Sequence, residues 1–292
     1  MKKIAILGCE NSHAASFLKL IAQKEEFSDV EVIGVFSEER EMAEKMRDKF
    51  SVPILENLED AAGKIDGLMI TARHGENHFK YAKPYLDSKI PMFIDKPITI
   101  CEEEAVLFME KLKEKGIAFS GGSSLRHDAF VKKLKEDVKN EVDGKTVGGY
   151  IRAPYQKDSK YGGFYFYAQH LVEMMGEIFG RYPLSVMAKE TDGNLHVLFH
   201  YENYDCIGFY CNEKYVYFAS RMAENAVTSF DIEQTDDWFY QEFSEFYELL
   251  SGKECTTDHQ DFIAPVFVMN AIERSLKSGK EEKVHEFEIK GE

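Results

Sequence analysis

The sequence predicts an α/β chain in which a doubly wound parallel sheet is followed by a C-terminal α+β domain on a mainly antiparallel open sheet. Two observations predict this fold. Strand and helix signals alternate over residues 1–122, which is typical of βαβ units and a parallel sheet. Strand signals then recur at hairpin spacing over residues 184–220, which favours antiparallel pairing. A length of 292 residues is sufficient for one large domain or two medium ones.

Five short apolar runs organise the first part of the chain. We expect strands at residues 4–7, 30–36, 67–71, 92–94 and from 117 to the glycine pair at 121–122. Between the runs, apolar residues recur at helical spacing, beginning near Ala14, Met42, Ala82 and Ala105. Three glutamates at residues 102–104 open the last of these helices, where the helix dipole favours acids.

The second part of the chain has a different order of elements. We expect helices over residues 130–138, around Leu171 and Met175, and in two final segments that begin near Phe239 and Phe262. Strands are expected at residues 147–151, 184–187, 195–200, 205–211 and 215–220.

Composition excludes some classes of partner. The formal net charge of −16 argues against nucleic acid and anionic membrane surfaces, because both attract basic proteins. The five cysteines form no CxxC pair, which favours reduced cytoplasmic thiols over a disulfide frame or a zinc site. The N-terminal apolar run is too short for a signal segment, and no run has membrane-spanning length. We therefore expect a cytoplasmic protein that holds no metal.

The turn after the first strand is a candidate for binding a dinucleotide. In such folds this turn commonly reads G-x-G-x-x-G, and the diphosphate lies on the amides of the following helix. Here the turn reads Gly8-Cys9-Glu10-Asn11-Ser12-His13, so only the first glycine is present. Asn11 or Ser12 can still cap the helix and leave its amides available to an anion. A capped turn without a cofactor is the alternative.

Two further loops border the same edge of the predicted sheet. After the second strand, an acid in Ser37-Glu38-Glu39-Arg40 would suit the ribose of NAD, whereas Ser37 with Arg40 would suit the 2′-phosphate of NADP. The third strand is followed by Thr71-Ala72-Arg73-His74 and then His78. His74 and His78 have metal-ligand spacing if helical. No third ligand lies near them, so a structural or cofactor-facing role is favoured.

Two segments carry residues suited to proton transfer. Asp95-Lys96-Pro97 ends the fourth strand, at the edge where open α/β sheets bind ligands. Lys96 can donate a proton or anchor a hydroxyl, although a solvated lysine is the simpler interpretation. Gly162-Gly163 precedes a helix with His170 and Glu173 on one face. An imidazole is a natural acid/base near neutral pH, and the alternative is a buried structural histidine.

Together these segments resemble the Gfo/Idh/MocA oxidoreductase family, whose members have a Glu-Lys-Pro motif after the fourth strand and a Gly-Gly…Asp-x-Gly-x-His-x-x-Asp segment. Asp95-Lys96-Pro97 resembles the first motif, and Gly162-Gly163 with His170 the second. His78 is similar to the histidine of the family's Thr-Pro-Asn-x-x-His segment, and Arg126 to an arginine just past the fifth or sixth strand.

The resemblance implies a Rossmann dinucleotide-binding domain over residues 1–122 and a substrate-binding and oligomerisation domain over residues 123–292. It implies NAD(P)-dependent hydride transfer to or from a secondary alcohol or ketone of a sugar, inositol or similar polyol. Lys96 and His170 would be catalytic, with Glu173 in support. The implied cofactor-binding residues are Gly8, Glu10, Asn11, Ser12, His13, Ser37, Arg40, Thr71, His74, His78, Asp95, Lys96 and Arg126. The open sheet implies a homodimer or homotetramer.

The sequence also departs from the family pattern. Phe166 stands where the family has an aspartate, and Glu10 and His13 replace the second and third glycines of the turn. Two alternatives to the dehydrogenase therefore remain. One is an NAD-dependent glycosidase of the same fold, and the other is a non-catalytic ligand-binding or regulatory protein.

Overall fold

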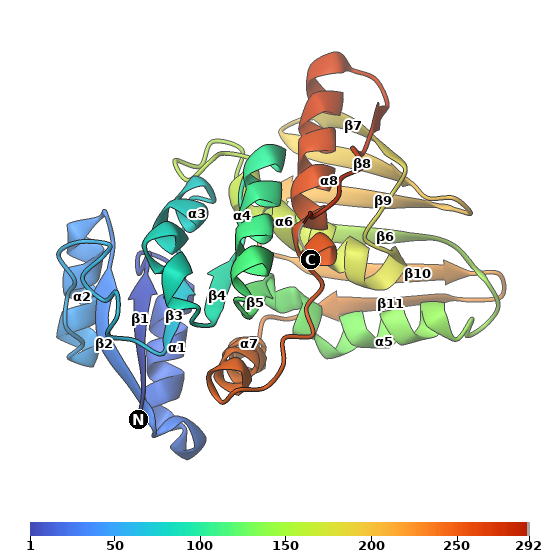
Figure 1. The fold of residues 1–292 in the computed structure, drawn as a ribbon. Helices are drawn as coiled ribbons and strands as arrows, with labels where there is room; N and C mark the ends of the chain where they lie inside the picture. Colours follow the sequence, from blue (N-terminus) through green and yellow to red (C-terminus); the bar gives the residue numbers. More distant parts are fainter. Residues whose placement is uncertain (291–292) are drawn as a thin grey trace.

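The structure is a computed structural model that describes residues 1–290, without the side chain of Asp236. Two sheets lie beside each other, the first on the left of Figure 1 and the second on the right. This arrangement confirms the predicted fold class.

The first sheet is parallel throughout and has the strand order β2-β1-β3-β4-β5. Its strands are β1 (Lys2–Leu7), β2 (Val30–Phe36), β3 (Gly67–Ile70), β4 (Met92–Asp95) and β5 (Phe119–Gly122). A single parallel bridge from Val35 to Ile54 extends the sheet beyond β2. Because β2 and β3 lie on opposite sides of β1, the order reverses there, and such a reversal is where open α/β sheets bind ligands.

Helices cover both faces of this sheet because its strands alternate their side chains between the faces. The helices are α1 (Ser12–Gln23), α2 (Arg40–Phe50), α3 (Glu76–Ala82) and α4 (Glu102–Lys115), with short 3-10 segments η1 (Glu25–Phe27) and η2 (Lys83–Ser88). Ile4 and Ile6 pack with α1 and α2, whereas Ala5 and Leu7 pack with α3 and α4. The helix expected across Ala82 changes to 3-10 at Lys83, next to Pro84, which lacks a backbone N–H.

The second sheet has the order β11-β10-β6-β9-β8-β7-β12. Its strands are β6 (Thr146–Tyr155), β7 (Ser185–Thr191), β8 (Asn194–His200), β9 (Asp205–Asn212), β10 (Tyr217–Ala223), β11 (Val227–Ile232) and β12 (Glu282–Lys283). All pairs are antiparallel except β6 with β9. The sequence analysis missed β11 because it is mostly exposed and carries a weak apolar pattern.

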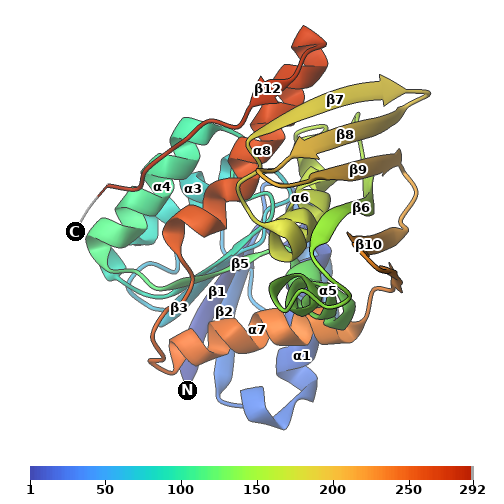
Figure 2. The same ribbon diagram turned by 90° about the vertical axis from the view of Figure 1, so that its right-hand side faces the viewer.

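One helix, α6 (Tyr165–Phe179), lies between the second sheet and the first part of the chain (Figure 2). Beside it are η3 (Ser124–His127) and α5 (Ala129–Lys139). The side chain of Asp128 caps α5 by accepting hydrogen bonds from the amides of Phe130 and Val131. The same carboxylate accepts the indole N–H of Trp238, 3.1 Å away.

The last two helices, α7 (Asp236–Leu250) and α8 (His259–Ser278), return from the second sheet to the first. On α7, Phe239, Phe243 and Phe246 enter the core beside α1. The start of α8 packs with α4, and its second half packs with α6 and the second sheet. The end of the chain therefore contributes to the cores of both predicted domains, and the domain boundary at residue 122 stays a prediction.

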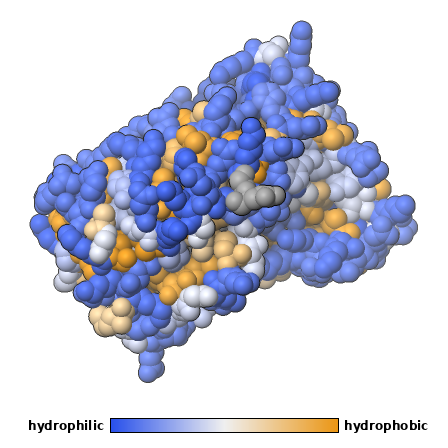
Figure 3. Space-filling model, in the orientation of Figure 1, coloured by the Kyte–Doolittle hydropathy of each residue, from blue (hydrophilic) through white to orange (hydrophobic). Residues whose placement is uncertain are grey.

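Hydrophilic residues cover most of the face in Figure 3, and hydrophobic residues gather mainly in its lower-left part. Among residues 1–290, no helix has both the length and the apolar character that crossing a bilayer requires.

We predict that Phe243→Ala destabilises the protein by about 3–5 kcal/mol, the usual range for emptying a buried phenylalanine site. The Phe243 ring is fully buried and lies 4.8 Å from that of Phe27 and 5.8 Å from that of Phe17. Chemical unfolding would measure the loss. Leu107→Ala, at an exposed position on α4, is the matched control and should change stability by no more than about 0.5 kcal/mol. Equal effects of the two substitutions would contradict the packing of α7 on this core.

Candidate active site and cofactor crevice

A fully buried carboxylate, that of Asp95, joins the end of β4 to the turn after β1. It accepts hydrogen bonds from Asn11 Nδ2 at 2.8 Å and from the amide of Lys96 at 2.7 Å, and His13 Nδ1 lies 2.9 Å away. Burial alone would raise the pKa of Asp95, but the neighbouring His13 and Lys96 outweigh it, so the pKa is lowered. The carboxylate is therefore charged at neutral pH.

Lys96 points from the end of β4 toward α6. Its side chain is 3% exposed, and Nζ donates to the carbonyl of Phe166 at 3.2 Å. The ammonium group lies 4.9 Å from the ring centre of Phe166 and 4.7 Å from that of Tyr167, within range of cation–π attraction. Burial lowers the pKa of Lys96, and the nearby Asp95 opposes this shift. The Phe166 carbonyl and the rings of Phe166 and Tyr167 therefore hold Lys96. Phe166 is the residue that stands where the family has an aspartate.

His170 lies on α6 and is 6% exposed. Its Nδ1 is 2.7 Å from the hydroxyl of Ser123, at the start of η3. Ser123 Oγ also accepts the amide of Leu125 at 3.3 Å. Burial lowers the pKa of His170 well below its usual range, and the charges of Lys96 and His13 lower it further. The imidazole is therefore neutral near pH 7 and able to accept a proton.

Lys96 and His170 line one cavity of about 70 Å³. Asn11, Ser12 and His13 border it from the turn after β1, and Arg73 from the loop after β3. The remaining lining residues come from the second sheet, η3, α6 and α7: Ser124, Leu125, Phe166, Tyr167, Tyr215, Tyr217, Gln234, Trp238 and Phe239. The contribution of α7 to this cavity was not predicted. Its helical pattern lies far from Lys96 in the sequence and does not indicate that the helix returns to the carboxyl edge of the first sheet.

Glu10 lies across the ends of the first three strands. Glu10 is buried, with 6% of the residue exposed. One oxygen accepts the hydroxyl of Ser37, after β2, at 2.7 Å, and the other accepts the amide of Arg73, after β3, at 3.0 Å. Beneath it, Thr71 Oγ1 donates to the carbonyl of Gly8 at 3.0 Å. A Cβ at Gly8 would lie 2.2 Å from the nitrogen of Ala72, which explains why the first glycine of the turn is retained.

The loop before α6 reaches the end of β2. Lys160 Nζ and Tyr161 Oη donate to the same oxygen of Glu39, at 2.9 Å and 2.8 Å. Arg73 lies against this loop, with its guanidinium carbon 5.1 Å from the ring centre of Tyr161. Arg40 faces elsewhere, because both of its terminal nitrogens bind Glu56 on the surface. These contacts were not predicted, since only the tertiary fold places residues 160–161 beside Glu39.

The two histidines of the third loop serve different local contacts. His78 is fully buried, with Nε2 2.7 Å from the carbonyl of Ala72 and Nδ1 3.2 Å from that of Ile98. Burial lowers the pKa of His78, so the neutral ring ties together the loops after β3 and β4. His74 Nδ1 accepts the amide of Glu76 at 3.3 Å. Residues 1–290 contain no cluster of ligands that could hold a metal ion.

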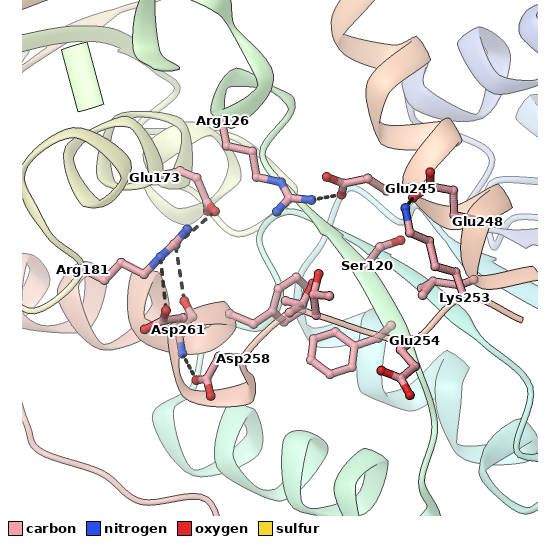
Figure 4. Close-up of a pocket in the computed structure, with 15 residues that line it drawn as sticks. Ser120, Arg126, Glu173, Arg181, Glu245, Glu248, Lys253, Glu254, Asp258 and Asp261 are labelled. Carbon is pink, nitrogen blue, oxygen red and sulfur yellow. Dashed lines mark hydrogen bonds and ion pairs between the residues drawn. The ribbon is translucent and has the colours of Figure 1, made fainter. Parts of the chain in front are cut away.

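Glu173 and Arg126 line a second cavity, of about 360 Å³, whose lining includes neither Lys96 nor His170 (Figure 4). Arg126 forms an ion pair with Glu245. Glu173 lies 3.6 Å from Arg181 and accepts Gln169 Nε2 at 3.0 Å. Gln169 in turn accepts the amide of Ile98 at 3.2 Å. Glu173 thus does not contact the His170 imidazole, and it reaches the Lys96 loop through Gln169.

Comparison with known proteins agrees with this architecture. Residues 2–123 match the Gfo/Idh/MocA family model, which is described as an oxidoreductase family with an NAD-binding Rossmann fold. This part of the chain is similar to that family. The resemblance predicted from the sequence is thereby confirmed. No curated protein sequence matches the chain.

Solved structures with a similar fold match nearly the whole chain. A putative myo-inositol dehydrogenase from Sinorhizobium meliloti has a TM-score of 0.81 at 14% identity, covering 98% of this chain and 100% of that one. Myo-inositol 2-dehydrogenase from Lactobacillus plantarum has a TM-score of 0.83 at 14% identity, covering 97% and 99%. Scyllo-inositol dehydrogenase from Lactobacillus casei, with bound NAD(H) and scyllo-inositol, has a TM-score of 0.82 at 13% identity, covering 97% and 99%. At these identities the likeness shows the fold.

The crevice of this Gfo/Idh/MocA domain fits a dinucleotide except at one side chain. Asn11 caps α1, whose N-terminus faces the crevice, and helix N-termini attract phosphate groups. Gly8 keeps the tight turn, and Ser37 lies at the end of β2, where the adenosine ribose binds in this fold. The exception is Glu10, whose carboxylate lies at the position of the second glycine of the motif.

We predict that the His170 imidazole stays neutral as the pH is lowered through 6.5, because burial and the charge of Lys96 both disfavour its protonated form. Titration by NMR of labelled imidazole groups would measure this, with His170→Gln identifying the signal. Lys96→Met removes the neighbouring ammonium group and should raise the pKa of His170. Protonation of His170 at or above pH 6.5 in the unmodified protein would contradict the prediction.

Proposed function

We propose that this protein is an NAD(P)-dependent oxidoreductase that transfers a hydride between a nicotinamide cofactor and a secondary alcohol or ketone of a sugar, inositol or similar polyol. The observation that carries the proposal is that Lys96 and His170, which come from different domains, line one small cavity at the carboxyl edge of the first sheet. The oxidoreductase family of residues 2–123 and the fold of the inositol dehydrogenases support it.

The two residues divide the acid/base work. The Lys96 ammonium group anchors the oxygen of the reacting hydroxyl, because a buried cation stabilises negative charge that develops there. The neutral His170 imidazole accepts the hydroxyl proton, and its Nδ1 contact with Ser123 fixes the orientation of the ring. A bound nicotinamide supplies the hydride acceptor. In the reverse direction, His170 returns the proton to the carbonyl oxygen.

Acidic side chains at the end of β2 favour NAD over NADP. Glu39 lies at this end of the crevice, whereas Arg40, the cation that could hold a 2′-phosphate, is bound to Glu56. Carboxylates suit the ribose hydroxyls of NAD and repel the additional phosphate of NADP. We propose NAD as the preferred cofactor.

We also propose that the protein forms a homodimer or homotetramer through the outer face of the second sheet. On the inner face, Gly208 faces Leu171 of α6. The neighbouring Ile207 therefore points outward and is 44% exposed, beside Leu198 and Tyr150 in the sheet register. An exposed apolar strand face of this kind is typical of an interface between subunits.

We predict that Lys96→Met and His170→Ala each reduce kcat by a factor of about 10² or more, as expected for the loss of an acid/base group. Oxidation of a panel of inositols and sugars with NAD, followed by NADH absorbance, would measure kcat, and circular dichroism would confirm folding. Lys80→Met, at a surface lysine paired with Glu38, is the control and should leave kcat within twofold, a change of roughly 0.4 kcal/mol. Full activity of both catalytic-pair variants would disprove the assignment.

We predict that Ile207→Asp separates the subunits, because it places a charge in the apolar interface. Native mass spectrometry would then show the 33.6 kDa monomer, whereas the unmodified protein would show a multiple of it. Val216→Asp introduces the same charge at a residue that is also exposed but lies between β9 and β10, and should keep the assembly intact. A monomeric unmodified protein would contradict the proposed interface.

A further inference from the structure

The inference concerns Glu10 and rests on the proposed function. Glu10 is the residue at the second glycine position of the turn, where the absence of a side chain normally lets the backbone approach a diphosphate. Here the position carries a buried carboxylate. It bridges the loops that follow β2 and β3, through Ser37 Oγ and the amide of Arg73.

The two donors that hold Glu10 are of the kind that a diphosphate requires. A hydroxyl and a backbone amide are common partners of phosphate oxygens, and both are directed at one point between the strand ends. When a dinucleotide enters, its oxygens and the Glu10 carboxylate compete for the same two donors. The two anions also repel each other, and this repulsion is strong where water is excluded.

The surroundings hold Glu10 in this place. Ser37 Oγ also accepts the amide of Glu39 at 3.1 Å, so the hydroxyl has a fixed position and its proton is directed to Glu10. The side chain of Arg73 turns away toward Tyr161 and Phe166, 5.1 Å and 6.0 Å from their ring centres. No cation among the described residues forms an ion pair with Glu10, so its charge is balanced by the two hydrogen bonds.

We propose that Glu10 is the specificity-determining residue of the crevice: its carboxylate occupies the diphosphate position and must rotate out before a dinucleotide binds. The affinity for diphosphate-containing ligands is therefore set by the competition between Glu10 and the ligand. Small ligands that leave the diphosphate position empty bind without moving Glu10.

The test compares NAD binding to the unmodified protein, Glu10→Ala and Glu10→Gln by isothermal titration calorimetry. We expect Glu10→Ala to bind NAD at least tenfold more tightly, because it removes both the charge and the competing acceptor. Glu10→Gln keeps the bulk but loses the charge, so its affinity should lie between the other two. Glu114→Ala removes an exposed carboxylate that pairs with Lys111 on α4 and is the matched control, with less than a twofold change expected.

Two smaller probes locate the effect. ADP contains the diphosphate, so its affinity should rise with Glu10→Ala in parallel with that of NAD, whereas that of adenosine should not change. An equal gain for adenosine would place Glu10 at the ribose and overturn the diphosphate assignment.

The outcomes separate this inference from the proposed function. If the unmodified protein and Glu10→Ala bind NAD equally well, the role of Glu10 is wrong and the oxidoreductase proposal stands. If neither binds NAD or NADP while circular dichroism shows both folded, the oxidoreductase proposal fails as well. If Glu10→Ala binds NAD and the unmodified protein does not, the proposed role of Glu10 is supported.

Discussion

The buried carboxylate of Asp95 is the contact on which the geometry of the crevice depends. It binds the turn after β1 through Asn11 and His13, and it binds the amide of Lys96 at the end of β4. Without these hydrogen bonds, a charge in a fully buried place would be strongly unfavourable. The carboxylate therefore keeps the two loops at a fixed distance, and Lys96 begins one of them.

Helix α6 contacts both Lys96 and the loop that follows it. On α6, Phe166 and Tyr167 contact Lys96, and His170 lies on the next turn beside Ser123. Gln169 accepts the amide of Ile98, and Glu173, one turn further along α6, accepts Gln169 Nε2. A shift of α6 would therefore move His170 directly. It would also move Lys96 and the loop after β4 through their contacts with the helix. The two predicted domains therefore contribute to one cavity although their sheets share no strand.

The replacements that distinguish this chain from the family pattern are connected to each other. His13, at the third glycine position, contacts Asp95 and packs against Phe239 of α7, with ring centres 5.0 Å apart. It also lies 3.5 Å from Glu242, whose pKa is raised well above its usual range by burial and by Asp95. A glycine at position 13 would remove this link between α1 and α7. His13, which replaces the third glycine of the turn, thus contributes to the packing of α7 on α1.

Much of the fold could be predicted from local patterns. Short apolar runs between helical segments are sufficient to indicate the parallel sheet, and the structure has those strands within a few residues. The weakly patterned β11 and the 3-10 turn at Pro84 were not recognised, since an exposed edge strand and a proline-interrupted helix lack a clear period. The pairing of Lys96 with His170 followed from two motifs, each of which lies beside a strand end or a glycine pair.

The sequence by itself determined the parallel sheet, the second mainly antiparallel sheet, and the residues whose chemistry suits proton transfer, because strand and helix periods and side-chain chemistry are local properties. Only the tertiary structure decided that Glu10 lies across the crevice, that Glu173 and Arg126 face a separate cavity, and that α7 returns to the first sheet. Helical spacing says which residues share a face. It does not say which cavity that face meets, because the neighbours of each turn come from segments far away in the chain.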